Sequence, residues 1–269
     1  MLSSIILDHL ASSRNNYEPS TSSDKPKEKK FYVSDMGKCQ RMRWLKRKGI
    51  STEFGGHVYW TFQIGNLYHD WVYSVLESKG ILIETEDYVI HPHFSGRYDA
   101  IIQLPEDDKQ HRAVLDIKSA GAWKFKKILD GGEDPEYIAQ VLTYQMLLQD
   151  SGRKDLDRST ILYVNKEPKD NIPSFHEMDF HLTKTREKAL RGEMDTLVEF
   201  WVEDRVPPCT CPAWMKNYNS FLPFCSATKD RVEDAVKLIK DGNKLISTHD
   251  AVFLETGEGE DLKRTQIKI

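Results

Sequence analysis

Hydrophobic and polar positions follow two different periods along this chain, which predicts helices mixed with strands. Apolar residues recur at helical spacing over 61–78 and again over 135–149. Short β-rich runs bounded by turn residues predict strands instead. These runs lie near 81–90, 97–104, 113–118 and 159–165, with a further alternating run at 174–182. We therefore expect an α/β fold in which a central mixed sheet is flanked by helices.

Helical segments are also expected at both ends of this sheet region. A capped helix should begin at Ser34 or Asp35 and end near Gly49, with Cys39 inside it. A long helix of mixed charge is expected over 184–202. A last helix is expected at roughly 229–246, followed by an irregular tail.

The same pattern suggests three regions along the chain. Residues 1–13 could form a short amphipathic helix, and the Ser-, Pro- and Lys-rich run that follows resembles a linker. We therefore expect a flexible leader at 1–30, a main domain at 31–226, and a C-terminal helix and tail at 227–269.

The stretch from Gly96 to Ser119 carries the most informative polar residues. Asp99 stands at the start of one predicted strand, and Asp116 and Lys118 stand near the end of the next. Because side chains alternate along a strand, Asp116 and Lys118 share one face. Burying an acid and a lysine there is costly without a partner, and a divalent cation held by Asp99 and Asp116 would supply one. An exposed ion pair at a sheet edge is the simpler alternative.

Composition narrows the classes of protein that fit. Charged residues make up 30% and hydrophobic residues 39%, and the net charge of −4 gives no global sign of nucleic-acid binding. No run of about 18 apolar residues indicates a membrane span, so no membrane association is expected. The N-terminal segment lacks the features of a secretory signal, which leads us to expect a cytoplasmic location. The four cysteines are then expected to be thiols or metal ligands.

One local run is strongly basic. Six Lys and Arg residues with an interleaved Trp44 lie between 38 and 48, and Lys124 belongs to a second, shorter basic run. Such a run is either a solvated helix face or a surface that binds phosphates.

Four short motifs now stand in order. They are Gly65-x3-His69, Gly96-x2-Asp99, Asp116-Ile117-Lys118 and Gln140-x3-Tyr144. In this order the chain resembles the RecB-type branch of the PD-(D/E)XK nuclease superfamily, and within it the phage and CRISPR-associated single-strand exonucleases. The resemblance covers about residues 34 to 225. It implies a restriction-endonuclease-like fold.

The resemblance also implies a role for each motif residue. His69, Asp99, Asp116 and the carbonyl of Ile117 would bind Mg²⁺ or Mn²⁺, since these donors suit a hard cation. Lys118 would hold the attacking water. Gln140 and Tyr144 would orient the DNA and brace the site. The catalytic set is then Asp99, Asp116, Lys118, Gln140 and Tyr144, and the DNA contacts are Arg41, Arg43, Lys46, Arg47, Lys124 and Tyr144.

In iron–sulphur members of this branch, one cysteine precedes the nuclease core and three follow it. Cys39, Cys209, Cys211 and Cys225 repeat that arrangement, although thirteen residues separate the last two. The resemblance implies a [4Fe–4S] cluster. A structural Zn²⁺ or buried free thiols are the alternatives.

These implications together predict a metal-dependent deoxyribonuclease. The expected activity is exonuclease cleavage of single-stranded DNA or DNA ends, in recombination or repair, with DNA and a recombination or replication protein as partners. If the gene belongs to a phage, the location would be the host cytoplasm. A structure-specific endonuclease, such as a resolvase or terminase-type nuclease, is the first alternative. A non-catalytic subunit that binds DNA ends is the second.

Overall fold

The computed structural model describes residues 29–53, 56–103, 112–169, 171–213, 215, 219–239, 243–257 and 261–269. Its chain divides into two compact units, which we describe separately. The sheet unit contains Tyr32–Gly37 and Val58–Gly192. The cysteine unit contains the chain up to Phe31, Lys38–His57 and Glu193–Ile269. The predicted leader at 1–30 falls almost entirely outside the described residues.

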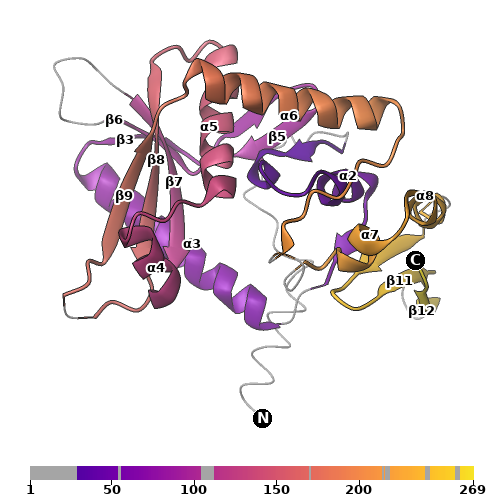
Figure 1. Cartoon of the computed structure of the whole chain (residues 1–269). Helices are drawn as coiled ribbons and strands as arrows, with labels where there is room; N and C mark the ends of the chain where they lie inside the picture. Colours follow the sequence, from indigo (N-terminus) through magenta and orange to yellow (C-terminus); the bar gives the residue numbers. More distant parts are fainter. Residues whose placement is uncertain are drawn as a thin grey trace. The chain divides into compact units, whose positions relative to one another are not determined.

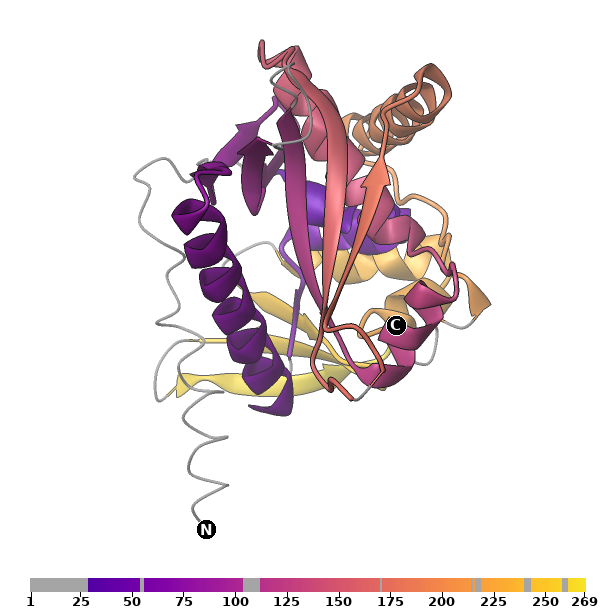
Figure 2. The ribbon, with the colours of Figure 1, turned by 90° about the vertical axis from the view of Figure 1, so that its left-hand side faces the viewer.

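A five-stranded mixed sheet forms the centre of the sheet unit, in the order β3-β6-β7-β8-β9 (Figures 1 and 2). Its strands are β3 (Leu82–Thr85), β6 (Ala100–Gln103), β7 (Arg112–Ala120), β8 (Leu156–Asn165) and β9 (Phe175–Phe180). β7 and β8 run parallel, and the other neighbouring pairs are antiparallel. The α/β class and the mixed central sheet are therefore confirmed.

Helices α3 (Gly56–Ser78) and α5 (Pro135–Asp150) cover opposite faces of this sheet. On one face, Val72 of α3 packs in a buried cluster with alternate residues of β7, among them Leu115 and Ile117. On the other face, Gln140 of α5 donates a hydrogen bond to Asp116. Strand alternation thus turns Ile117 into the apolar core and Asp116 toward α5.

The rest of the sheet unit departs from the sequence expectations in two places. The predicted strand near 81–90 is two strands, because Glu86 adopts a left-handed φ of 52° between β3 and β4 (Tyr88–Ile90). β4 pairs with β5 (Phe94–Arg97) in a separate sheet that also holds β1 (Phe31–Tyr32). A helix that we did not predict, α4 (Ala122–Leu129), follows β7 directly.

The N-terminal basic helix begins later than expected. A 3-10 turn, η2 (Val33–Asp35), comes first, and α2 spans only Gln40–Lys48. The chain turns between them because Gly37 has a φ of 76°, a left-handed conformation that glycine adopts without strain. Cys39 is consequently the residue before the helix rather than part of it.

The C-terminal part of the cysteine unit also differs from expectation. α8 (Lys229–Lys237) ends well before 246, and strands form both in the last part of the expected helix and in the region expected to be an irregular tail. β10 (Lys244–Ser247), β11 (Val252–Thr256) and β12 (Lys263–Ile267) make a four-stranded sheet with β2 (Ser51–Thr52), in the order β12-β11-β10-β2. β12 is almost entirely exposed, so burial does not impose an apolar alternation on its sequence.

The remaining helices are α6 (Lys184–Val202), as predicted, and the short α7 (Leu222–Ser226). Among the described residues, no helix combines the length and apolar character needed to cross a lipid bilayer.

Candidate active site

Two neighbouring strands bring the predicted carboxylates together. Asp99 lies in the bend immediately before β6, and Asp116 lies in the middle of β7. The Asp99 carboxylate accepts a hydrogen bond from the backbone N–H of Ile117, with a nitrogen–oxygen distance of 2.7 Å. This bond fixes one acid against the strand that carries the other.

His69 reaches the same point from α3. Its Nε2 lies 3.1 Å from the carbonyl oxygen of Ile117, and its Nδ1 lies 3.8 Å from the Asp99 carboxylate. Tyr73, one helical turn later, places its hydroxyl 3.4 Å from the same Nδ1. The side chains of His69 and Asp99 are about one-fifth exposed, so solvent and ligands can reach this point.

Asp116 and Lys118 form a largely buried ion pair, in which the Lys118 side chain is 19% exposed. The Asp116 side chain is 1% exposed, and Lys118 Nζ lies 2.9 Å from its Oδ1 and 2.8 Å from its Oδ2. Among the residues that the structure describes, none makes a hydrogen bond of good geometry with Oδ2. The exposed ion pair at a sheet edge, our simpler alternative, is therefore wrong for Asp116.

Burial sets the protonation of this pair. It raises the pKa of Asp116 to about 7, although the Lys118 ammonium opposes the shift. Burial alone would lower the pKa of Lys118, but the carboxylates of Asp116 and Asp99 outweigh it and raise that pKa. Without another cation, Lys118 therefore keeps its proton and acts as a hydrogen-bond donor.

Residues of α5 brace the site from the other side. Gln140 donates to Asp116 Oδ1 at 3.0 Å, and Tyr144 donates to the backbone carbonyl of Arg97 at 2.8 Å. A Cβ at Gly96 would lie only 2.8 Å from the Tyr144 hydroxyl, so glycine is required there. Tyr144 is 1% exposed, which makes it a bracing residue rather than the surface DNA contact we expected.

Lys124, the remaining DNA contact predicted in this unit, lies beside the same site. Its Nζ bonds Asp134 at 2.7 Å and sits 4.3 Å from the centre of the Tyr137 ring. Lys118 Nζ lies 4.9 Å from the same ring. Tyr137, one helical turn before Gln140, thus faces two ammonium groups. Sequence reasoning did not single out Tyr137, because its link to the site depends on which face of the helix points toward the sheet.

The four cysteines form a second candidate site, within the cysteine unit. Their sulphur atoms all lie within 4.8 Å of one another. The Cys39–Cys209, Cys39–Cys225 and Cys211–Cys225 sulphur distances are 3.8, 4.0 and 3.7 Å. A disulfide needs about 2.05 Å, so these are free thiols gathered as a set of four soft ligands.

Hydrogen bonds at this site favour negative charge on sulphur. Asn219 Nδ2 lies 3.3 Å from the sulphurs of both Cys211 and Cys225. A hydrogen bond from Cys225 lowers the pKa of Cys39 to about 4. Burial raises the pKa of Cys211 to about 12, and the neighbouring Cys39 sulphur adds to the shift. Sequence reasoning missed Asn219, since nothing in the pattern sets it apart.

The arginines predicted to bind DNA are buried and make contacts inside the cysteine unit. Arg41, Arg43 and Arg47 are 8, 2 and 5% exposed. Arg43 pairs with Glu193, and Arg47 lies over the rings of Phe31 and Trp201.

Arg41 has three backbone acceptors. Its guanidinium donates to the carbonyls of Pro207, Phe224 and Ala227, at 2.9–3.1 Å. Of the four predicted DNA contacts on α2, only Lys46 is not buried. These three arginines therefore stabilise the fold rather than form an open phosphate-binding face, which corrects the sequence expectation.

No protein-family model matches the chain, and no curated protein matches its sequence. Structural comparison gives distant similarities. The structure of SSO0001 is 18% identical over 79% of this chain and 96% of its own, with a TM-score of 0.42. An alkaline exonuclease (LHK-Exo) from Laribacter hongkongensis is 12% identical over 73% and 97%, with a TM-score of 0.39. A phage-related exonuclease from Haemophilus somnus 129PT is 16% identical over 51% and 72%, with a TM-score of 0.33.

Proposed function

We propose that this protein is a metal-dependent DNA exonuclease of the PD-(D/E)XK type, acting on single strands or DNA ends. The observation that carries the proposal is the convergence of His69, Asp99, Asp116, Lys118 and Gln140. These residues come from four separated motifs and form one connected set of contacts. Packing alone does not require polar residues from four separate motifs to meet at one solvent-accessible point.

The residues present fit a hard divalent cation. His69 Nε2 and the Ile117 carbonyl are 3.1 Å apart, close to the roughly 3.0 Å between adjacent ligands of an octahedral ion bound at about 2.1 Å. The Asp99 and Asp116 carboxylates supply the charge, and Asp116 Oδ2 lacks a good hydrogen bond. Mg²⁺ or Mn²⁺ would be held by these four groups.

The bound metal would polarise a phosphodiester and lower the pKa of water. The chain's own residues would do the rest. Lys118 would donate a hydrogen bond that positions the attacking water next to Asp116. Gln140 would hold Asp116 in place, since its amide already donates to Oδ1. Tyr73 would fix the His69 ring through Nδ1.

The decisive test is cleavage of end-labelled linear and circular single-stranded DNA with Mg²⁺, Mn²⁺ or EDTA. We expect metal-dependent loss of the linear DNA alone, and the label lost first will give the polarity. Cutting of the circle would instead indicate the endonuclease alternative. Binding to DNA ends without cleavage in either metal would indicate the non-catalytic subunit and overturn the enzyme proposal.

We also propose that the four-cysteine site binds a metal that ties the start of α2 to the segment carrying the other three cysteines. Around a single zinc bound at about 2.3 Å, the sulphurs of a tetrahedron lie about 3.8 Å apart. The distances of 3.7–4.0 Å support this single ion. In a [4Fe–4S] cluster each thiolate binds a different iron, so the sulphurs would have to lie further apart.

Metal analysis of protein purified without oxygen separates these two cofactors. We expect a colourless preparation with one zinc per chain. A brown preparation that contains iron and absorbs near 400 nm would support the cluster implied by the sequence resemblance instead. A preparation that contains neither zinc nor iron would indicate four free thiols and overturn the proposal of a bound metal.

A further inference from the structure

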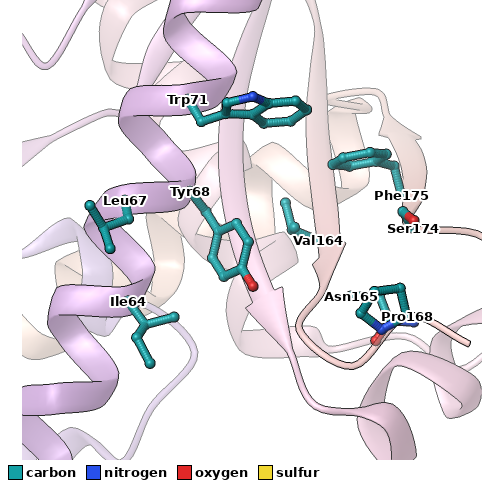
Figure 3. A pocket seen from close by; sticks show the side chains of 9 residues that line it. All are labelled: Ile64, Leu67, Tyr68, Trp71, Val164, Asn165, Pro168, Ser174 and Phe175. Carbon is teal, nitrogen blue, oxygen red and sulfur yellow. The ribbon is translucent and has the colours of Figure 1, made fainter.

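An apolar slot lies beside the candidate active site, on the same sheet unit, and no function described above uses it. It has a volume of about 570 Å³. One wall comes from α3, and the other comes from the end of β8, the loop after it and the start of β9 (Figure 3). Its lining residues are Ile64, Leu67, Tyr68, Trp71, Val164, Asn165, Pro168, Ser174 and Phe175.

Exposed aromatic rings are the main feature of the slot. Trp71 and Phe175 stack with their ring centres 5.6 Å apart and their planes 13° from parallel. They remain 50 and 42% exposed, and Leu67 is 66% exposed. Figure 3 shows both rings at one end of the slot, while Tyr68 projects from α3 toward Val164. Large apolar side chains exposed together in this way mark a contact surface.

A second, independent feature is an unsatisfied donor. Asn165 is 4% exposed, and its Oδ1 accepts a hydrogen bond from the backbone N–H of Glu167. Its Nδ2 is buried and has no hydrogen-bond partner among the described residues. A buried donor without an acceptor is costly. The slot therefore suits a flat apolar group that also carries acceptors on its edge.

The slot adjoins the candidate active site through both of its walls. On α3, Tyr68 immediately precedes His69 and Trp71 follows it by two residues, and on the sheet Val164 and Asn165 pair in register with Ser119 and Ala120. Ala120 lies two residues beyond Lys118, or about 7 Å along the strand. That distance is about two steps of 3.4 Å between stacked nucleotides.

We propose that this slot receives unpaired bases of the DNA strand whose phosphate lies at Asp99 and Asp116. Stacking on Trp71 and Phe175 suits any base, because every base has an aromatic face. Each base also carries acceptors for the Asn165 amide. A paired base offers neither its free faces nor its pairing edge, so the slot selects single strands. This inference rests on the proposed function and assigns the recognition of unpaired bases to the slot.

The test compares binding of a labelled single strand with that of the same strand carrying abasic nucleotides, with Mg²⁺ and Mn²⁺ omitted to prevent cleavage. We expect the full-length protein to bind the intact strand about tenfold more tightly, the usual effect of one stacked base. Trp71→Leu and Phe175→Leu should each remove that difference. Trp60→Leu is the matched control, because Trp60 lies on the same helix with 52% exposure and does not line the slot.

Equal binding of intact and abasic strands, or unchanged binding by both slot variants, would overturn the proposal. If wild-type protein still cleaves linear DNA in that case, the nuclease assignment stands and only the slot is wrong. If Trp71→Leu instead changes the oligomeric state seen by light scattering and leaves DNA binding unaltered, the slot is a protein contact. Circular dichroism of each variant checks that it is folded.

Discussion

At the scale of single residues, the buried ion pair of Asp116 and Lys118 dominates the candidate active site. Each group removes the cost of burying the other, and Gln140 adds a hydrogen bond to the acid. Breaking a buried pair by removing one partner costs about 3–5 kcal/mol, because the other charge stays buried. The pair is therefore important for stability as well as for the proposed chemistry.

Variants of this pair should separate the two roles. We expect Asp116→Asn and Lys118→Met each to reduce cleavage at least about 100-fold, since both act on the reacting groups. The double variant should regain much of the lost thermal stability but none of the activity. Asp179→Asn is the control, because this carboxylate pairs with Arg158 on the same sheet at 3.0 Å. Active Asp116→Asn protein would contradict the site assignment.

Tyr73 gives a second prediction at the residue scale. Its hydroxyl lies 3.4 Å from the ring nitrogen of His69 that faces away from the Ile117 carbonyl. Partners of a metal-binding histidine typically change metal affinity by about 10–100-fold. Tyr73→Phe should thus raise the Mn²⁺ concentration needed for half-maximal cleavage by about tenfold, with little change in the maximal rate. An unchanged metal requirement would show that Tyr73 does not position His69.

At the scale of elements, the two motif glycines have different reasons to be glycine. Gly96 lies in β5, where a Cβ would meet both the Tyr144 hydroxyl and the Val33 side chain within 3 Å. Gly65 lies in α3, and within the described part of the chain nothing comes within 4 Å of such a Cβ. The first glycine permits the close approach of a helix to a strand, and the second has no packing role in this structure.

Alanine at the two positions should therefore act in opposite directions. Gly96→Ala should lower the free energy of unfolding by about 1–3 kcal/mol, the usual cost of overpacking. Gly65→Ala should raise it by about 0.5–1 kcal/mol, because alanine favours a helix. Denaturant unfolding of both variants measures this contrast. A destabilised Gly65→Ala variant would show that a side chain at position 65 is not tolerated and would contradict this prediction.

Arg41 holds the elements around the four-cysteine site together. Its guanidinium donates hydrogen bonds to the carbonyl of Pro207, before Cys209, and to the carbonyls of Phe224 and Ala227, one on each side of Cys225. Hydrogen bonds from a charged donor contribute about 1.5–3 kcal/mol each when buried. Arg41→Met should accordingly destabilise the protein by at least about 3 kcal/mol, measured by denaturant unfolding. Lys237→Met, at an exposed position of α8, should change stability by less than about 0.5 kcal/mol.

At the scale of the whole molecule, the four cysteines connect segments about 170 residues apart in sequence. A metal that binds only the folded arrangement stabilises it by mass action. Removing it with a strong chelator should lower the melting temperature by several degrees, and adding zinc should restore it. Cys225→Ser should show the same loss without chelator. A melting temperature that stays the same with the chelator and in the Cys225→Ser variant would show that the four cysteines bind no stabilising metal.

The local patterns were sufficient for the elements that carry the site. Helical periodicity predicted α3 and α5, because burial of one face imposes that period directly. Short β-rich runs bounded by turn residues predicted the strands of the central sheet. The spacing of Asp116 and Lys118 on β7 likewise set which side chains share a face. Weakly apolar segments gave no such signal, which is why β10 to β12 were missed.

Tertiary structure alone decided which polar residues are reachable. The sequence shows a basic helix, but only the packed unit reveals that Arg41, Arg43 and Arg47 are buried on internal partners. The same holds for the apolar slot, since Trp71 and Phe175 are about 100 residues apart and meet only when α3 lies against the sheet. Local periodicity determines an element and its face, whereas exposure depends on residues far away in the chain that no local pattern encodes.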